Sequence, residues 1–111
     1  MCGITGYSGS FNQSQLASAL TAISHRGPDD SGTFVDDTNK IGLAHARLAI
    51  VDLSLAGHQP MQSVDGKSVL IFNGEIYNHV ELRRDLESGG YRFRGRSDTE
   101  VLLNLYLECD K

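Results

Sequence analysis

The chain has 111 residues, enough for one modest domain that can bury most of a core, and nothing in its sequence indicates a second domain. Fourteen acidic and ten basic residues give a net charge of −4, which argues against a nucleic-acid backbone or an anionic membrane as the main partner. With two cysteines, no secretory pattern and only short apolar runs, we expect a reducing, cytoplasmic setting and no membrane span.

Short apolar segments alternate along the chain and predict a mixed α and β fold. A strand is expected over residues 4–7, and Leu16, Leu20 and Ile23 then fall at helical spacing before a turn at residues 26–29. Later apolar or β-branched runs predict strands that include Val35 and residues 41–44, 48–51 and 69–72.

Two helices are expected toward the end of the chain. The first begins near Asn78, whose side chain is expected to cap the helix while Glu81 reaches back, and the glycine pair 89–90 ends it. The second opens at residues 97–100, with Ser97 as the candidate cap.

The last helix carries apolar side chains up to the end of the sequence. Leu102, Leu105 and Tyr106 are still able to pack when the sequence stops at Lys111, so we expect a chain that is cut short. Cys109 lies on the same apolar helix and is interpreted as a small core residue.

Cys2 is the first residue of chemical interest. Removal of Met1 would place a thiol and a free α-amine on this one residue. A thiolate is the attacking form of cysteine, and the adjacent amine can take its proton, which is the chemistry of an N-terminal nucleophile. The alternative is an ordinary reduced thiol at a disordered start of the chain.

Five motifs together carry a resemblance to a known family. In chain order they are Met1-Cys2-Gly3-Ile4, His25-Arg26-Gly27-Pro28-Asp29, Ala44-His45-Ala46-Arg47-Leu48, Asn73-Gly74-Glu75-Ile76-Tyr77-Asn78 and Ser97-Asp98-Thr99-Glu100. Each string can recur by chance, but five in this order over essentially the whole chain form a strong signal. The chain resembles the N-terminal glutaminase domain of glutamine-hydrolysing asparagine synthetases, within the glutamine amidotransferases that use an N-terminal cysteine.

This resemblance implies an α+β fold, the four-layer αββα sandwich of N-terminal nucleophile hydrolases, with two antiparallel sheets between helical layers. Residues 1–111 would be the N-terminal part of a type 2 glutamine amidotransferase domain, with the rest of that domain and a synthetase domain absent. The synthetase domain is expected to use ATP and Mg²⁺ to convert aspartate to asparagine with ammonia delivered through a tunnel, whereas the glutaminase part needs no cofactor. Open sheet edges would favour a homo-oligomer or partial disorder.

For Cys2, the resemblance implies attack on the side-chain amide of glutamine, a glutamyl thioester and release of ammonia, with the α-amine as proton shuttle. The ordinary pKa values of a thiol and an α-amine are both roughly 8 to 8.5, so proton exchange between them is nearly thermoneutral. A retained Met1 would turn this amine into an amide and predicts an inactive chain.

The remaining substrate contacts are also implied by the resemblance. Asn73 and Gly74 would form the oxyanion hole, although the pair could instead be only a tight turn. Arg47 would bind the α-carboxylate of glutamine, Asp98 its α-ammonium, and Glu75 would help to orient that end. The alternatives are a surface cation at a strand end for Arg47 and a carboxylate at a helix N-terminus for Asp98.

The motif at residues 25–29 is assigned support rather than chemistry, with Arg26 ordering the site. A dyad of His25 and Cys2 is the rival mechanism, but no third orienting residue stands out and an amine base is already available. We expect no metal site, because ligand spacing is lacking among the four histidines and the cysteines are not paired; the histidines are His25, His45, His58 and His79.

The sequence therefore predicts hydrolysis of glutamine to glutamate and ammonia, with asparagine as the product of the complete protein. Glutamine and the synthetase domain of the same full-length chain are the expected partners. Two alternatives remain open. The same glutaminase could feed another acceptor, or the chain could be a non-catalytic interaction module in which Cys2 is incidental.

Overall fold

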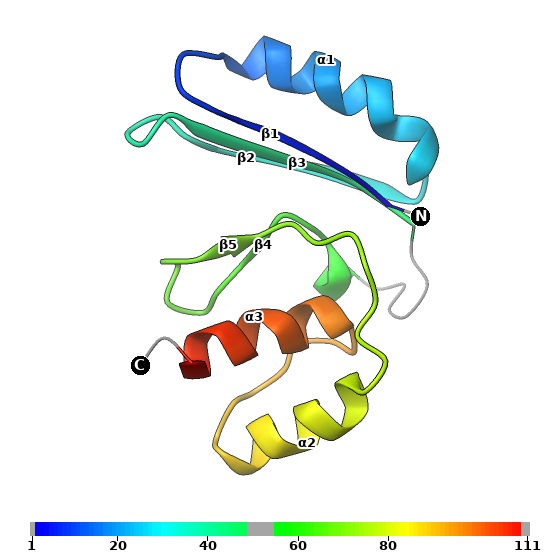
Figure 1. Ribbon diagram of the computed structural model, residues 1–111, viewed down its shortest axis with the longest axis vertical. Coiled ribbons are helices and arrows are strands. Elements are labelled where there is room, and N and C mark those ends of the chain that lie inside the picture. Colours follow the sequence, from blue (N-terminus) through cyan, green and yellow to red (C-terminus); the bar gives the residue numbers. More distant parts are fainter. Residues whose placement is uncertain (1, 49–54, 110–111) are drawn as a thin grey trace.

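A computed structural model of the chain describes residues 2–48 and 55–109. Strands and helices occur together along the chain, as the sequence predicts (Figure 1). The strands are β1 (Gly3–Ser8), β2 (Asp30–Asp36), β3 (Ile41–Arg47), β4 (Met61–Gln62) and β5 (Val69–Leu70), and the helices are α1 (Gln13–Ile23), α2 (His79–Ser88) and α3 (Asp98–Cys109), with short 3-10 turns η1 (Ser24–Arg26) and η2 (Leu55–Gly57). Across these described parts, every helix is too short or too polar to cross a membrane.

The strands β1, β3 and β2 form an antiparallel sheet with β3 in the centre, and α1 covers one face of it (Figure 1). A Cβ atom added to Gly3 would lie 3.1 Å from Cδ1 of Ile23, so the missing side chain lets α1 approach. Ala46 pairs with Gly3 and is fully buried on this side. Because side chains alternate along a strand, His45 and Arg47 point to the opposite face, away from α1.

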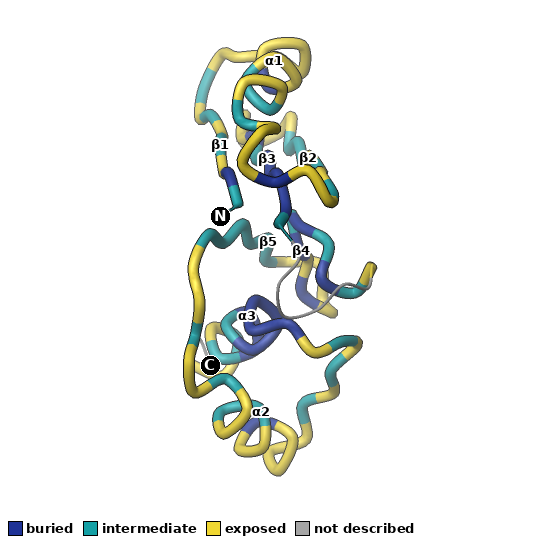
Figure 2. The backbone as a smooth tube through the Cα atoms, turned by 90° about the vertical axis from the view of Figure 1, so that its right-hand side faces the viewer, coloured by how far each residue is buried: buried dark blue, intermediate teal, exposed yellow. Residues whose placement is uncertain are grey.

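The short strands β4 and β5 form a second antiparallel pair, which lies between the three-stranded sheet and α3 (Figure 1). Figure 2 shows that buried residues follow β3 and the first part of α3, whereas α2 is mostly exposed. The helices α2 and α3 pack against each other on the side away from the large sheet. This arrangement agrees with an α+β domain, and the four-layer sandwich stays a prediction.

The helix ends follow local capping chemistry with one exception. Oγ of Ser97 accepts the N–H of Glu100 at 3.2 Å, which confirms Ser97 as the cap of α3. The glycines at 89–90 end α2 as predicted, with Gly90 at a φ of +99°. The helix α2 begins directly after Asn78 as predicted, but the predicted capping bond is wrong: among the described residues the Asn78 side chain makes no capping hydrogen bond, because its ψ of 28° departs from the extended backbone that an N-cap needs.

One expected strand run is shorter than predicted, and another lies mostly outside the described residues. Pairing in the run 69–72 stops after Leu70, because the Phe72 N–H leaves the ladder and donates to the side chain of Gln59 at 2.6 Å. In the run 48–51, Leu48 follows β3 without strand structure, and residues 49–51 lie outside the described residues.

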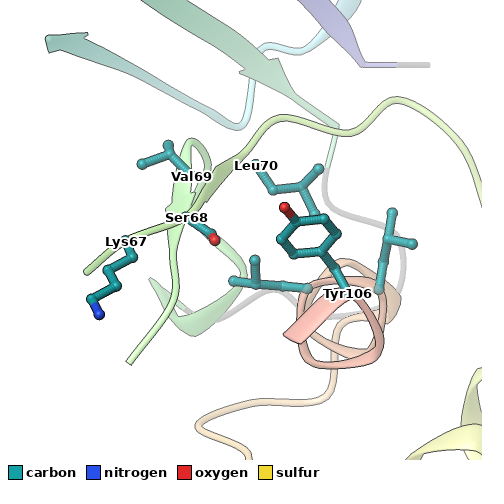
Figure 3. Close-up of a pocket in the computed structure, with 7 residues that line it drawn as sticks. Lys67, Ser68, Val69, Leu70 and Tyr106 are labelled. Carbon is teal, nitrogen blue, oxygen red and sulfur yellow. The ribbon is translucent and has the colours of Figure 1, made fainter. Parts of the chain in front are cut away.

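The last turns of α3 are less buried than the sequence predicts. Cys109 is exposed, so its interpretation as a core residue is wrong: the end of the helix faces solvent. Tyr106 is 54% exposed and borders an open cleft of about 420 Å³ between β5 and α3 (Figure 3). The cleft is lined by Lys67, Ser68, Val69, Leu70, Leu102, Leu103 and Tyr106.

Candidate active site

The thiol of Cys2 lies at the end of the three-stranded sheet. Cys2 directly precedes β1, and the pairing of β1 with β3 carries it to the residue after β3. The backbone N–H of Leu48 donates to Sγ at 3.2 Å, and Sγ lies 3.6 Å from the carbonyl oxygen of Leu48. Cys2 is half-buried as a residue, and these two contacts give its sulfur a defined position.

The motif at residues 25–29 is held against both Cys2 and β3. Nε of Arg26 donates to the backbone carbonyl of Cys2 at 3.4 Å, and the Asp29 N–H donates to the carbonyl of Arg47 at 3.0 Å. Gly27 packs so closely that an added Cβ would lie 2.2 Å from the Ala46 oxygen. The structure therefore brings Arg26 to Cys2, where the family resemblance implies a supporting residue.

Arg47 ends β3 but is not a surface cation. Its side chain is only 8% exposed, on the sheet face opposite α1. Nη1 lies 3.9 Å from Oδ2 of Asp30, which is its partner in the β2–β3 register, and the same oxygen lies 2.5 Å from Nδ1 of His58. A guanidinium taken out of water needs such an anion, so this ion pair allows Arg47 to stay buried beside the thiol end of the sheet.

Asp98 is buried at the first turn of α3 and is tied to the motif at residues 73–78. Its Oδ2 accepts the backbone N–H of Ile76 at 2.9 Å. Asp98 is thus both the helix N-terminal carboxylate of the alternative interpretation and an anchor for the loop. Within that loop Glu75 and Gly74 are exposed and Asn73 is half-buried, so all three can meet a ligand.

Sequence analysis missed His45, which is fully buried on the same face of β3 as Arg47. Its Nε2 lies 3.1 Å from the carbonyl oxygen of Phe72, and its Nδ1 has no hydrogen-bond partner among the described residues. Burial lowers the pKa of His45, and the nearby Arg47 and His58 lower it further, against the opposing effect of the Phe72 carbonyl. A neutral imidazole that donates from Nε2 fits these contacts, and the alternation of β3 was the signal that could have indicated it.

The sequence-predicted residues fall into two groups that border one region. Cys2, Arg26 and Arg47 gather at the end of the large sheet, and Asp98 joins the loop at 73–78. Both views place the start of β1 beside the segment that joins β5 to α2 (Figures 1 and 2). The contact of His45 with Phe72 fastens β3 to that segment, directly before Asn73. Within residues 2–48 and 55–109, no three histidine, cysteine or acidic side chains gather as metal ligands.

Comparison with known proteins assigns the family. The family described as "Glutamine amidotransferase domain" matches residues 1–111. Asparagine synthetase [glutamine-hydrolyzing] 1 of Bacillus subtilis is 43% identical over 116 residues, which cover 96% of this chain and 17% of that protein. A probable asparagine synthetase of Schizosaccharomyces pombe is 52% identical over 78% of this chain and 15% of that protein, and Amidase chry2 of Gibberella zeae is 38% identical over 83% and 14%.

The chain thus spans less than a fifth of the length of these three relatives. The match to the family nevertheless runs from the first to the last residue. The chain belongs to the glutamine amidotransferase domain family, and its similarity to asparagine synthetases confirms the resemblance carried by its five motifs.

Proposed function

We propose that this chain binds and hydrolyses glutamine, and that the released ammonia serves an amide-forming reaction of the complete protein. The observation that carries the proposal is the thiol of Cys2, which lies at the same end of β3 as the buried cation Arg47 in a chain of this family. A nucleophile and a carboxylate-binding group at one sheet end fit an amino-acid amide better than a substrate without charge.

The chemistry begins when Met1 has been removed and the α-amine of Cys2 is free. This amine takes the thiol proton as Sγ bonds to the amide carbon of glutamine, and it returns the proton to the nitrogen that leaves as ammonia. A water molecule then attacks the thioester carbon, its proton goes back to sulfur, and glutamate departs. The nearly equal ordinary pKa values of the thiol and the amine, roughly 8 to 8.5, make both transfers easy near neutral pH.

The oxyanion of each tetrahedral intermediate is assigned to Asn73 and Gly74. The side-chain NH₂ of Asn73 and the backbone N–H of Gly74 are donors of the kind that stabilise developing negative charge. Their support comes from the loop anchor: Asp98 holds the Ile76 N–H, and His45 lies against the Phe72 carbonyl, so the loop is fixed on both sides of the two donors.

Recognition of free glutamine is assigned to its charged end. Arg47 is planar and can bind the α-carboxylate with two parallel hydrogen bonds. Asp98 supplies the anion for the α-ammonium, and Glu75, exposed on the same loop, helps to orient that end. This pair of opposite charges would discriminate glutamine from uncharged amides.

The acceptor of the ammonia is proposed from the relatives. Because two of them are named as glutamine-hydrolysing asparagine synthetases, we assign aspartate as the acceptor in the complete protein. In this proposal the glutaminase domain has the four-layer fold, and ATP and Mg²⁺ act in a separate domain of the same chain. A different acceptor is the second candidate, because a relative of similar identity is named an amidase.

The test is glutaminase activity of the processed full-length protein. We expect glutamate and ammonia in equal amounts, a thioester adduct on Cys2 in acid-quenched samples, and stoichiometric labelling of Cys2 by a glutamine-like diazoketone. Cys2→Ser should lose all three signals, whereas Cys109→Ser, at the exposed thiol, should keep them. Folded, processed protein that is neither labelled nor active would favour the non-catalytic module instead.

A further inference from the structure

The two side chains assigned to the charged end of glutamine come from distant parts of the fold. Arg47 ends β3 and Asp98 begins α3. We infer that the dipeptide His58-Gln59 is a spacer that fixes the separation of these two residues, so that one glutamine molecule can engage both at once. The inference rests on the proposed function, and it makes His58 and Gln59 positioning residues.

His58 acts on the Arg47 side through Asp30. Its Nδ1 lies 2.5 Å from Oδ2 of Asp30, and that oxygen is 3.9 Å from Nη1 of Arg47. The His58 side chain is 40% exposed, whereas that of Arg47 is buried, so the contacts of Asp30 connect a surface residue with the buried cation. The contact with His58 restricts how the Asp30 carboxylate can turn, and the charge of this carboxylate attracts the guanidinium of Arg47 across 3.9 Å.

Gly32 lets the spacer lie directly on β2. A Cβ atom at this position would be 2.4 Å from the backbone oxygen of Gln59 and 2.6 Å from Nε2 of His58. Gly32 follows Asp30 by two residues and therefore lies on the same face of the strand. The close packing of Gly32 against the dipeptide, and not only the contact of His58 with Asp30, thus sets the distance between the spacer and β2.

Gln59 acts on the Asp98 side through its amide. Nε2 donates to Oγ1 of Thr99 at 3.0 Å, and Oε1 accepts the N–H of Phe72 at 2.6 Å. Gln59 and Thr99 are both buried, so these bonds are shielded from water. One side chain therefore joins the start of α3, where Asp98 lies, to the segment that leads into Asn73.

A spacer has a consequence that a merely stabilising contact lacks. A ligand with two charged groups gains affinity because the first contact holds the second group near its partner, and that gain depends on the separation of the two sites. A ligand with only one charged group has no such gain. Loosening the spacer should therefore weaken the binding of glutamine more than the binding of a ligand with only one charged group.

The experiment measures binding by calorimetry to full-length, processed protein that carries Cys2→Ala, so that no turnover occurs. The ligands are glutamine, 4-aminobutanamide, which lacks the α-carboxylate, and glutaramate, which lacks the α-ammonium. Thr99→Val removes the acceptor of the Gln59 amide, and His58→Ala frees Asp30. For each we expect the Kd of glutamine to rise about tenfold and those of the two analogues to change less than about twofold.

Matched controls separate this effect from general loosening. Gln62→Leu, three residues along at an exposed site, and Asp36→Asn, at the other end of β2, should leave all three affinities unchanged. Arg47→Ala should raise the Kd values of glutamine and glutaramate by similar factors, because both ligands lose a direct contact with their carboxylate. In protein with Cys2 intact, the spacer variants should raise KM and largely keep kcat. Denaturant unfolding of the same variants measures whether their stability has changed.

The outcomes are distinct. Equal losses for all three ligands, or an unchanged Kd for glutamine in both spacer variants, would overturn the spacer while wild-type hydrolysis still supports the proposed function. A folded wild-type protein that neither binds nor hydrolyses glutamine would overturn the proposed function, and the spacer with it.

Discussion

The backbone N–H of Leu48 points at Sγ of Cys2 across 3.2 Å, although the two residues are 46 positions apart in the sequence. Pairing of β1 with β3 brings them together, and Arg26 holds the carbonyl of Cys2 from η1. The position of the sulfur thus depends on the last residues of β3. Changes that disturb this end of the sheet should therefore lower glutaminase activity as well as stability.

Gly27→Ala is expected to disturb this end of the three-stranded sheet most directly. The new Cβ would lie 2.2 Å from the Ala46 oxygen and 2.5 Å from the Arg47 nitrogen, both backbone atoms that cannot turn away. We expect the free energy of unfolding to fall by about 1–3 kcal/mol, measured by chemical denaturation, and glutamine turnover to fall with it.

Gly89→Ala is the control for this substitution. Its Cβ would meet the Leu86 oxygen only at 3.4 Å, and Gly89 has a φ of −85°, so an alanine fits. Equal losses of stability in the two variants would show that the packing of Gly27 against β3 is unimportant.

Asn73→Ala should lower kcat with little change in KM, because an oxyanion donor acts mainly in the transition state. Loss of one such donor costs about 2.7–4 kcal/mol, or about 10²–10³ in kcat. Steady-state kinetics on glutamine measures this. Asn12→Ala, which removes the cap of α1, should cost about 1 kcal/mol of stability and leave kcat unchanged. A kcat within twofold of wild type in Asn73→Ala would remove Asn73 from the oxyanion hole.

The buried His45 predicts a pH dependence of stability. Burial lowers its pKa below the ordinary 6.5, so below that pH the unfolded chain binds a proton that the folded chain resists. Stability should therefore fall as the pH decreases through 6.5. His45→Gln keeps a donor for the Phe72 carbonyl without titrating, and it should flatten this part of the curve of unfolding free energy against pH.

Asp36 provides the matched comparison at lower pH. Hydrogen bonds from Asn39 and Thr38 lower the pKa of Asp36 below 3.8, so its stabilising contribution is present above that value and is lost as the pH falls further. Asp36→Asn should leave the slope near pH 6.5 intact. A slope that is the same in His45→Gln and wild type would instead place the pH dependence in other groups.

Local elements were predictable because local chemistry sets them. The spacing of Leu16, Leu20 and Ile23 indicated α1, and Ser97 with its bond to Glu100 fixed the start of α3. Asn78 failed the same kind of prediction, because the loop before α2 gives it a backbone that cannot cap.

The candidate site was predictable in its members but not in its connections. The motifs supplied Cys2 and Arg47, yet the partner of Arg47 depends on the register of β2 and β3, which a single strand does not encode. The bonds of Gln59 reach 13 and 40 residues along the chain, to Phe72 and Thr99. Such partners become visible only once the strands and α3 are packed together.

A retained residue before Cys2 should abolish turnover without abolishing binding. Met1 lies outside the described residues, but the chemical reason is general: an acylated nitrogen shares its lone pair with the carbonyl group and is too weakly basic to take the thiol proton. We expect full-length protein with an uncleavable extension before Cys2 to bind glutamine with wild-type affinity and to form no thioester. Intact mass spectrometry verifies the N-terminus, and a glutaminase assay with calorimetry reports the two properties. Turnover at the wild-type rate in protein proven to keep the extension would show that some other group takes the proton. His25, exposed on η1 beside Arg26, would then be the first residue to replace.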